Sequence, residues 1–378
     1  MSRLTSRRPV VDLAAVRAAV GAVHDPELGM TLAEAGLVGD ITVSRSGHVR
    51  VQLRLTTQGC PLESELTAAS HRAAVAVASV TTVDVAVATL SARERAELAD
   101  RVAASSAPLT GGLGAPAPRI LAVASGKGGV GKSTVTANLA AALAASGERV
   151  GVLDADVWGY SIPQLFGMRR SPVVLGEKML PVPAHGVALM SIGFFVADDQ
   201  PVVWRGPMLH KALSQFVTDT AWGALDSLLV DLPPGTGDAT LSVLNLLPDA
   251  TLLVITTPQA TARTVATRVA RMAAESGRCV TGVVENMSAS VCGSCGEHTA
   301  LFGTGGGRQL ADDVGAPLLG RVPLDVELRE AGDRGVPVVL ATPQSASARE
   351  LTRIASALPA ASRRSLAGRA LPLSVVTR

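Results

Sequence analysis

Apolar runs separated by stretches with helical spacing fill the chain from residue 119 to residue 358. Seven of these runs are predicted strands, at residues 120–124, 150–153, 187–192, 228–232, 252–256, 280–284 and 318–319. Within the runs most apolar residues are consecutive rather than alternating, which is typical of strands buried on both faces of a parallel sheet. The pattern predicts an α/β fold, with a doubly wound, mostly parallel sheet and helices on both faces.

The first 104 residues follow a different pattern. Apolar residues recur at helical spacing at Leu13, Val16, Val20 and Val23. In residues 49–55 apolar and polar residues alternate, as in a strand with one buried face. A further helical stretch, a strand and a charged helix follow, so residues 1–104 are predicted to form a small α+β domain that precedes the larger sheet.

Two segments lack sustained periodicity. Residues 105–118 are rich in Ser, Gly, Pro and Ala and carry no charge before Arg119, so they are predicted to be a linker. Residues 359–378 lose the helical spacing and are predicted to be a flexible tail. The larger α/β domain is therefore expected to span residues 119–358.

The composition of the chain limits the kinds of partner that it is expected to bind. With 34 basic and 32 acidic residues, a net charge of +2 and no block of like charge, the chain is not expected to bind nucleic acid. It has no uncharged apolar stretch of about 18 residues, and no apolar signal-peptide region follows its first arginines, so we expect no stable membrane association and a cytoplasmic location. Four cysteines in 378 residues do not suggest a disulfide framework.

The segment GKGGVGKS matches the phosphate-binding motif G-x-x-x-x-G-K-[ST] at every position. It lies between the predicted strand 120–124 and a predicted helix at 134–145. Glycines let backbone N–H groups face phosphates, Lys132 reaches the β and γ oxygens, and Ser133 offers its hydroxyl to Mg²⁺. We expect ATP and Mg²⁺ to bind at Gly126, Lys127, Gly128, Gly129, Val130, Gly131, Lys132, Ser133 and Thr134.

Acidic residues stand at two strand ends that a doubly wound sheet brings beside this motif. Asp154 and Asp156 follow one strand, and Asp231 ends the apolar run of another. We expect Asp156 to orient the attacking water, Asp154 to join the Mg²⁺ shell, and Asp231 to act on Mg²⁺ directly or through water. Helix capping is the alternative for any single one of them. The loop at 233–238 has the glycines of a switch that senses the γ-phosphate.

Cys292 and Cys295 form a CxxC pair in a predicted loop. Thiolates select iron–sulfur clusters, zinc or copper(I), and such sites usually have four ligands. Two subunits that each donate this pair would complete a four-thiolate site across a two-fold axis. The alternatives are a zinc site completed by His298, a thioredoxin-type disulfide and a loop without a ligand.

Together these segments resemble the Mrp/ApbC family of iron–sulfur cluster carrier ATPases. The likeness extends over residues 119–358 and rests on the motifs GKGGVGKST, DADVWG, WRGPM, DLPPGTGD, ENMS and CxxC. The segments DPEL and AGLV and the pair Cys60-Pro61 resemble a small iron–sulfur assembly domain found in bacterial members. In the MinD, ParA and Mrp class, a lysine at the position of Lys127 reaches the nucleotide of a partner subunit. The likeness thus implies a nucleotide-sandwich homodimer, and it implies that Asn286 contacts adenine.

The implied function is a slow ATPase that loads or transfers an iron–sulfur cluster, expected to be 4Fe–4S and to bridge two subunits. The implied partners are a cluster-assembly scaffold and apo iron–sulfur proteins. A MinD/ParA-like positioning ATPase and a zinc or nickel metallochaperone remain as alternatives. The chain departs from the family at Gly293 and Ser294, which are smaller than usual, and at Tyr160. Cys60 is either a transient cluster ligand or a core residue, and Cys279 is expected in the core.

Overall fold

The computed structural model describes residues 11–57, 59–105, 109, 117–196, 206–291, 295 and 297–359. Most of the predicted linker and tail, and Cys292 of the CxxC pair, lie outside these residues. The chain divides into two compact units. The first contains Met1–Ser106, Ser171–Pro183 and Asp219–Gly223, and the second contains the remainder. Each unit is described by itself.

The second unit contains the predicted parallel sheet. Its strands are β6 (Arg119–Ser125), β7 (Val150–Asp154), β10 (Val182–Ala184), β11 (Val187–Ser191), β12 (Ser227–Asp231), β13 (Thr251–Thr256), β14 (Val280–Val291), β15 (His298–Thr299) and β16 (Leu318–Leu324). They are ordered β10-β11-β7-β12-β6-β13-β14-β15, and β16 also pairs with β14. The pairs from β11 to β14 are parallel, and β15 is antiparallel to β14. The predicted fold class is confirmed.

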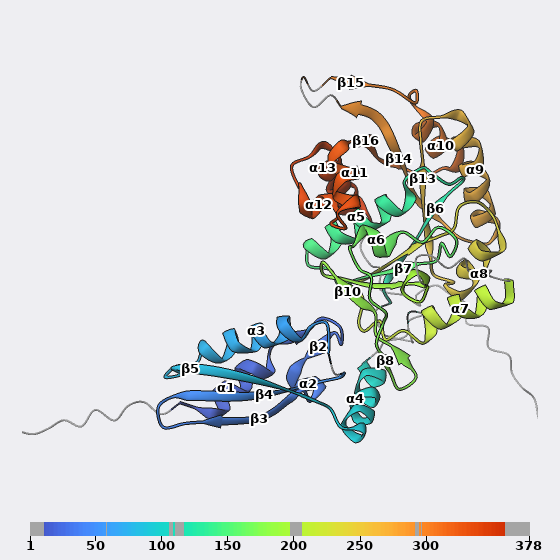
Figure 1. Cartoon of the computed structure of the whole chain (residues 1–378). Coiled ribbons are helices and arrows are strands. Elements are labelled where there is room, and N and C mark those ends of the chain that lie inside the picture. Colours follow the sequence, from blue (N-terminus) through green and yellow to red (C-terminus); the bar gives the residue numbers. More distant parts are fainter. Residues whose placement is uncertain are drawn as a thin grey trace, which may run out of the picture. The chain divides into compact units, whose positions relative to one another are not determined.

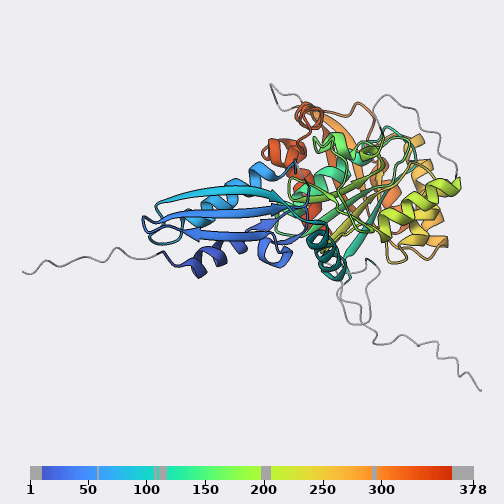
Figure 2. The ribbon, with the colours of Figure 1, turned by 60° about the horizontal axis from the view of Figure 1, so that its bottom comes forward.

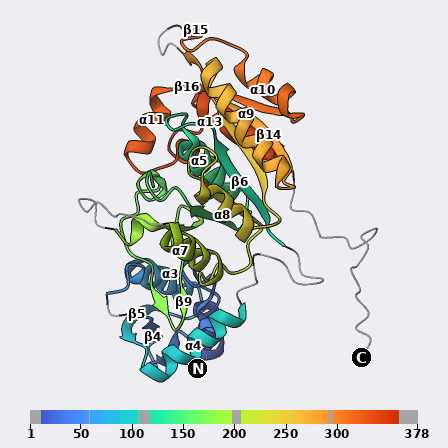
Figure 3. The same ribbon diagram turned by 90° about the vertical axis from the view of Figure 1, so that its right-hand side faces the viewer.

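Helices cover both faces of this sheet (Figure 1). One layer contains α5 (Lys132–Ala145), α12 (Val338–Ala341) and α13 (Ala346–Ala357). The other contains α7 (Gly206–Thr218), α8 (Asp238–Leu246), α9 (Ala260–Glu275) and α10 (Gly306–Val314) and faces the viewer in Figure 3. Two short helices, α6 (Ile162–Leu165) and α11 (Val326–Asp333), and the 3₁₀ turn η1 (Ile192–Phe194) complete the unit. Every residue of β7 and β12 is buried, because each strand is covered on both faces.

The register of the strands brings polar and acidic side chains to one edge of the sheet. β12 lies between β6 and β7, and the Cα partner of Asp231 on β7 is Asp154. The Cα partner of Asp154 on β11 is Ser191. Because the strands are parallel, their carboxyl ends all meet at the edge where β6 passes into the glycine-rich segment.

The first unit is built on a three-stranded sheet (Figure 2). β3 (Val38–Val43) and β4 (His48–Leu55) are antiparallel, and β5 (Thr82–Thr89) is parallel to β4. The other elements are α1 (Leu13–Gly21), β1 (His24–Asp25), β2 (Met30–Thr31), α2 (Leu32–Ala35), α3 (Glu63–Val75) and α4 (Ala92–Ser105). Val16, Val49, Leu66 and Leu98 are buried in one apolar cluster.

Residues from far along the chain join this cluster. A two-stranded hairpin, β8 (Val174–Leu175) and β9 (Lys178–Met179), contributes Leu175, and Leu180 follows it. Ala221 also belongs to the cluster. Both segments come from inside residues 119–358, and nothing in the local sequence pattern separates them from the parallel sheet.

Two cysteines have different surroundings. Cys60 is 7% exposed and belongs to the apolar cluster of the first unit. Cys279 is exposed, so the expectation that it lies in the core is wrong. It lies one residue before β14 begins, and its carbonyl accepts a hydrogen bond from the N–H of Leu252. Its side chain lies outside the space between the sheet and the helices.

None of the helices in the described part of the chain is long and apolar enough to cross a bilayer.

Candidate functional site

The glycine-rich segment forms a tight loop between β6 and α5. Gly129 and Gly131 have φ values of 80° and 78°, in the left-handed region that favours glycine. Gly126 is required for packing, because a Cβ there would lie 2.4 Å from the carbonyl carbon of Val265 and 2.3 Å from the nitrogen of Ala266, both in α9. A Cβ on Gly128 would have nothing within 4 Å.

This loop lines a cavity of about 790 Å³. The other walls come from the loop after β7, from α7 and from the segment after β12. The lining residues are Ser125, Lys127, Gly128, Gly129, Val130, Gly131, Lys132, Ser133, Thr134, Asp156, Trp158, Gly159, Ser161, Leu209, Pro233, Pro234, Gly237, Asp238, Ala239 and Thr240. The structure thus gathers nearly all of the predicted ATP-binding positions around one space beside a helix N-terminus, an arrangement suited to phosphate.

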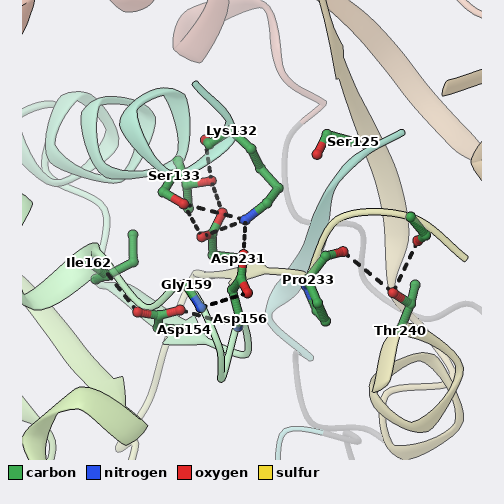
Figure 4. Close-up of polar contacts among 12 residues, drawn as sticks. Ser125, Lys132, Ser133, Asp154, Asp156, Gly159, Ile162, Asp231, Pro233 and Thr240 are labelled. Atoms are coloured by element: carbon green, nitrogen blue, oxygen red, sulfur yellow. Dashed lines mark hydrogen bonds and ion pairs between the residues drawn. The ribbon is translucent and has the colours of Figure 1, made fainter. Parts of the chain in front are cut away.

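Lys132, which lines the cavity, is paired with the fully buried Asp231 (Figure 4). The Nζ of Lys132 lies 2.7 Å from Oδ2 of Asp231 and 3.6 Å from Oδ2 of Asp156. Ser133 donates its hydroxyl to Oδ2 of Asp231, and Thr136 donates at 2.9 Å to Oδ1. Asp231 is fully buried and Lys132 is 6% exposed, so each charge depends on the other for compensation.

The crowding of carboxylates alters their proton affinity. Burial, and next the charge of Asp231, raise the pKa of Asp154 to about 7, although Lys132 opposes this. Burial also raises the pKa of Asp156, again against the charge of Lys132. One lysine therefore opposes the charge of three acids.

Asp154 and Asp156 occupy different places. Asp156 lines the cavity, whereas Asp154 is fully buried and is not among the described lining residues. Its carboxylate accepts hydrogen bonds from Ser191 Oγ at 2.9 Å and from the backbone nitrogens of Asp156 and Ile162 at 3.3 Å each. The predicted role of Asp154 in the Mg²⁺ shell stays a prediction.

The segment after β12 turns back toward the glycine-rich loop. Gly235 has φ of 88°, and its N–H donates to the carbonyl of Ser125 at 2.9 Å. Thr240, in α8, donates its hydroxyl toward the carbonyl of Gly235 at 3.3 Å. This predicted switch segment is therefore fastened to the end of β6, beside the place expected for the γ-phosphate.

Asn286 lies on the other side of the loop. It is 3% exposed, and its Nδ2 donates to the carbonyl of Val130 at 2.8 Å. It also borders a second cavity, of about 430 Å³. That cavity is lined by Gly131, Thr134, Ser161, Gln164, Leu165, Asn286, Met287, Pro323, Leu324, Asp325, Leu328, Arg329, Gly332 and Asp333. The expected adenine contact of Asn286 stays a prediction, and the bond to the loop was not foreseen from the sequence.

Lys127 is half-buried and lines the first cavity. Its Nζ donates to Oε1 of Gln259 at 3.4 Å. Gln259 directly precedes α9. Within one chain, Lys127 therefore points toward the start of a helix of its own subunit.

β14 and β15 form an antiparallel hairpin (Figure 1), and the CxxC segment falls in the sequence between them. Val291 of β14 pairs with His298 of β15, and Ser290 pairs with Thr299. Cys295 is exposed. Among the described residues, which omit Cys292, no group of three or more His, Cys, Asp or Glu side chains is arranged to hold a metal ion.

Two models of known protein families match this chain. Residues 117–359 match the model of a family described as NUBPL iron-transfer P-loop NTPase. The chain belongs to the NUBPL iron-transfer P-loop NTPase family. Residues 13–85 match a second model, described as iron–sulfur cluster assembly protein. The expected family resemblance is therefore confirmed, and the chain is a P-loop NTPase of the ParA type.

Relatives of this NUBPL-type NTPase are similar over nearly its whole length. It is 47% identical over 373 residues to a protein of Mycobacterium tuberculosis named iron–sulfur cluster carrier protein, with 97% of each chain covered. A protein of the same name from Synechocystis is 41% identical and covers 88% of this chain and 93% of its own. A nucleotide-binding protein of Archaeoglobus fulgidus, solved with ADP, is 38% identical with a TM-score of 0.53, over 60% of this chain and 89% of its own.

Proposed function

We propose that this chain is an ATP-hydrolysing carrier that receives an iron–sulfur cluster from an assembly scaffold and transfers it to apo iron–sulfur proteins. Membership of an iron-transfer NTPase family supports this, as do relatives named carriers over most of the chain. One observation carries the proposal: β14 bears Asn286, which is bonded to the phosphate loop, and ends at Val291, directly before the CxxC segment.

In this proposal ATP places its phosphates in the larger cavity and its adenine and ribose in the smaller one, against Asn286. Lys132 exchanges Asp231 for phosphate oxygens, and Asp156 orients the attacking water. Ser133 and Asp231 offer the hard oxygen donors that suit Mg²⁺, and their present proximity fits a shared ion. Mg²⁺ bound there would neutralise charge on the phosphates.

Dimerisation completes both sites. Lys127 leaves Gln259 and reaches the nucleotide of the partner subunit. Cys292 and Cys295 of each subunit supply four thiolates to one bridging 4Fe–4S cluster. ATP hydrolysis is then a slow switch that changes the dimer geometry and so decides whether the cluster is held or released. A reducing cytoplasm keeps such thiolates available.

Anaerobic reconstitution with iron and sulfide tests the carrier function. The wild-type chain should show cluster absorbance, about two iron atoms per subunit and the mass of a dimer. The double variant Cys292→Ser/Cys295→Ser should lose all three signals.

Cys279→Ser is the matched control, since Cys279 is also exposed but lies at the other end of β14. It should reconstitute as wild type does. Tightly bound zinc, or iron that survives the double substitution, would overturn the carrier proposal and favour a metallochaperone.

A further inference from the structure

The loop of residues 155–161, between β7 and α6, carries four cavity-lining residues: Asp156, Trp158, Gly159 and Ser161. Within the loop, the N–H of Val157 donates to the carbonyl of Ala155 at 3.1 Å. The N–H of Gly159 donates to the carbonyl of Asp156 at 3.2 Å and also to its carboxylate at 3.2 Å. Outside the loop, the N–H of Ala155 donates to the carbonyl of Asp231 at 2.9 Å, and the Nζ of Lys132 lies 3.6 Å from Oδ2 of Asp156. These contacts act near the start of the loop, yet water activation needs the whole loop to hold its carboxylate at a fixed place.

Both ends of this loop converge on Asp154. Oδ1 accepts from the N–H of Asp156 near the start, and Oδ2 accepts from the N–H of Ile162 directly after the end. Ile162 is the first residue of α6, and the preceding Ser161 makes no capping bond with its own side chain. The carboxylate of Asp154 therefore supplies the partner that the helix start lacks.

Asp154 is itself anchored to the neighbouring strand. Ser191 is fully buried, pairs with Asp154 in the β11–β7 register and donates its hydroxyl to Oδ2 at 2.9 Å. The same hydroxyl oxygen accepts from the N–H of Gly193 at 3.1 Å, which fixes its rotamer. Three of about four acceptor positions on the carboxylate are thus in use inside the protein.

We propose that Asp154 is a positioning residue that closes the loop of residues 155–161 at both ends and thereby sets where Asp156 stands. It acts through the loop and not as a ligand of Mg²⁺. The inference deepens the proposed hydrolysis and rests on it for the kinetic readout, whereas the geometry of the loop can be tested without nucleotide.

Trp158 supplies a probe, because its side chain is 62% exposed and stands in the middle of the loop. Time-resolved fluorescence anisotropy of nucleotide-free protein, corrected by subtraction of the same protein with Trp158→Phe, reports the mobility of this residue. Asp154→Asn keeps the size but replaces one acceptor with a donor, so the fast, local component should grow about twofold or more.

Kinetics separate positioning from metal binding. For Asp154→Asn, kcat should fall about 100-fold, because a displacement of about 1 Å has that cost. The KM for ATP and the Mg²⁺ concentration at half-saturation should stay within about threefold of wild type, since neither depends on loop closure. Ser191→Ala leaves the carboxylate in place and should change anisotropy and kcat in the same direction, with kcat lower by about tenfold.

Ser227→Ala is the matched control, because Ser227 is also fully buried and donates to a carboxylate, Glu148, but at the opposite end of the sheet. It should leave the Trp158 signal unchanged. A rise of tenfold or more in the Mg²⁺ requirement of Asp154→Asn, with unchanged anisotropy, would overturn the inference. If Asp154→Asn fails to fold, an unchanged Trp158 signal in Ser191→Ala overturns it. If wild type does not hydrolyse ATP, the proposed function fails, while the anisotropy comparison still decides the loop.

Discussion

The phosphate loop and the β14–β15 hairpin adjoin the same sheet but are held in different ways. Around the loop, Lys132 and Asp231 are buried and paired, and hydroxyls from α5 complete the contacts. At the hairpin, β15 is two residues long, both of its residues are exposed, and Cys295 faces solvent. The first region is organised within one chain. The second is exposed, which suits its proposed role at a dimer interface.

This difference means that the two regions contribute differently to the folding stability of the chain. Buried charges in the pocket are costly unless all of them are compensated, and here a lysine and the acids are mutual partners. An exposed thiol such as that of Cys295 costs the fold almost nothing. Single substitutions in the pocket should therefore affect both folding and activity. Substitutions in the hairpin should affect only the binding of the iron–sulfur cluster.

The largest expected effect is that of Lys132→Ala. It removes the cation from three neighbouring acids and should lower unfolding stability by about 3 kcal/mol or more, and it should reduce kcat by at least about 100-fold. Thermal unfolding and steady-state hydrolysis measure the two. Arg93→Ala, which removes a surface pair with Glu97, is the control and should change stability by about 0.5 kcal/mol at most. Equal melting temperatures for the two variants would contradict the contrast.

Asn286→Ala should come next. It leaves the carbonyl of Val130 without its partner, and a loss of about 1.4 kcal/mol would weaken ATP binding about tenfold, as measured by calorimetry. Ser288→Ala is matched to it, because Ser288 lies on the same strand and also donates to a backbone carbonyl, that of Val322. That control should keep wild-type affinity. Equal losses in both would point to general damage to β14.

A smaller effect should appear in the pH dependence of stability. The pKa of Asp154 is raised to about 7 from 3.8, so between these values the folded chain retains a proton that the unfolded chain releases. Raising the pH from 4 to 7 should therefore lower the melting temperature of wild type relative to Asp154→Asn, by an amount on the order of a few degrees. Above pH 7 the difference should level off. A difference that grows with pH in the opposite sense would refute the assignment.

The smallest effect should be that of Cys295→Ser on the cluster-free chain. Since the side chain is exposed, stability should change by about 0.5 kcal/mol or less and ATP affinity should not change. Denaturant unfolding and nucleotide titration check both. A clear loss of stability would mean that the hairpin is organised within one chain after all.

The sheet was predictable because its strands are apolar on both faces and its phosphate motif fixes where one strand stops and one helix begins. The acids Asp154 and Asp231 could be placed beside that motif, since carboxyl ends of parallel strands share an edge.

Three features could not be read from the sequence. Ser191 lies 37 residues from the carboxylate to which it donates, and only strand register joins them. The hairpin around Leu175 looks like any other surface turn, and its place in the core of the first unit depends on contacts far along the chain. The bond from Asn286 to Val130 is likewise a product of packing and not of any local pattern.

The glycines of the phosphate motif differ in how freely they could be replaced during evolution. Gly126 has no room for a methyl group beside the backbone of α9, so a relative that had abandoned nucleotides altogether would still keep it. A Cβ on Gly128 would meet nothing within 4 Å of this chain, so a bound phosphate is the reason to retain this glycine. In lineages that drift, loss of Gly128 with retention of Gly126 should therefore mark a pseudoenzyme, and motif searches would gain by weighting the two positions separately.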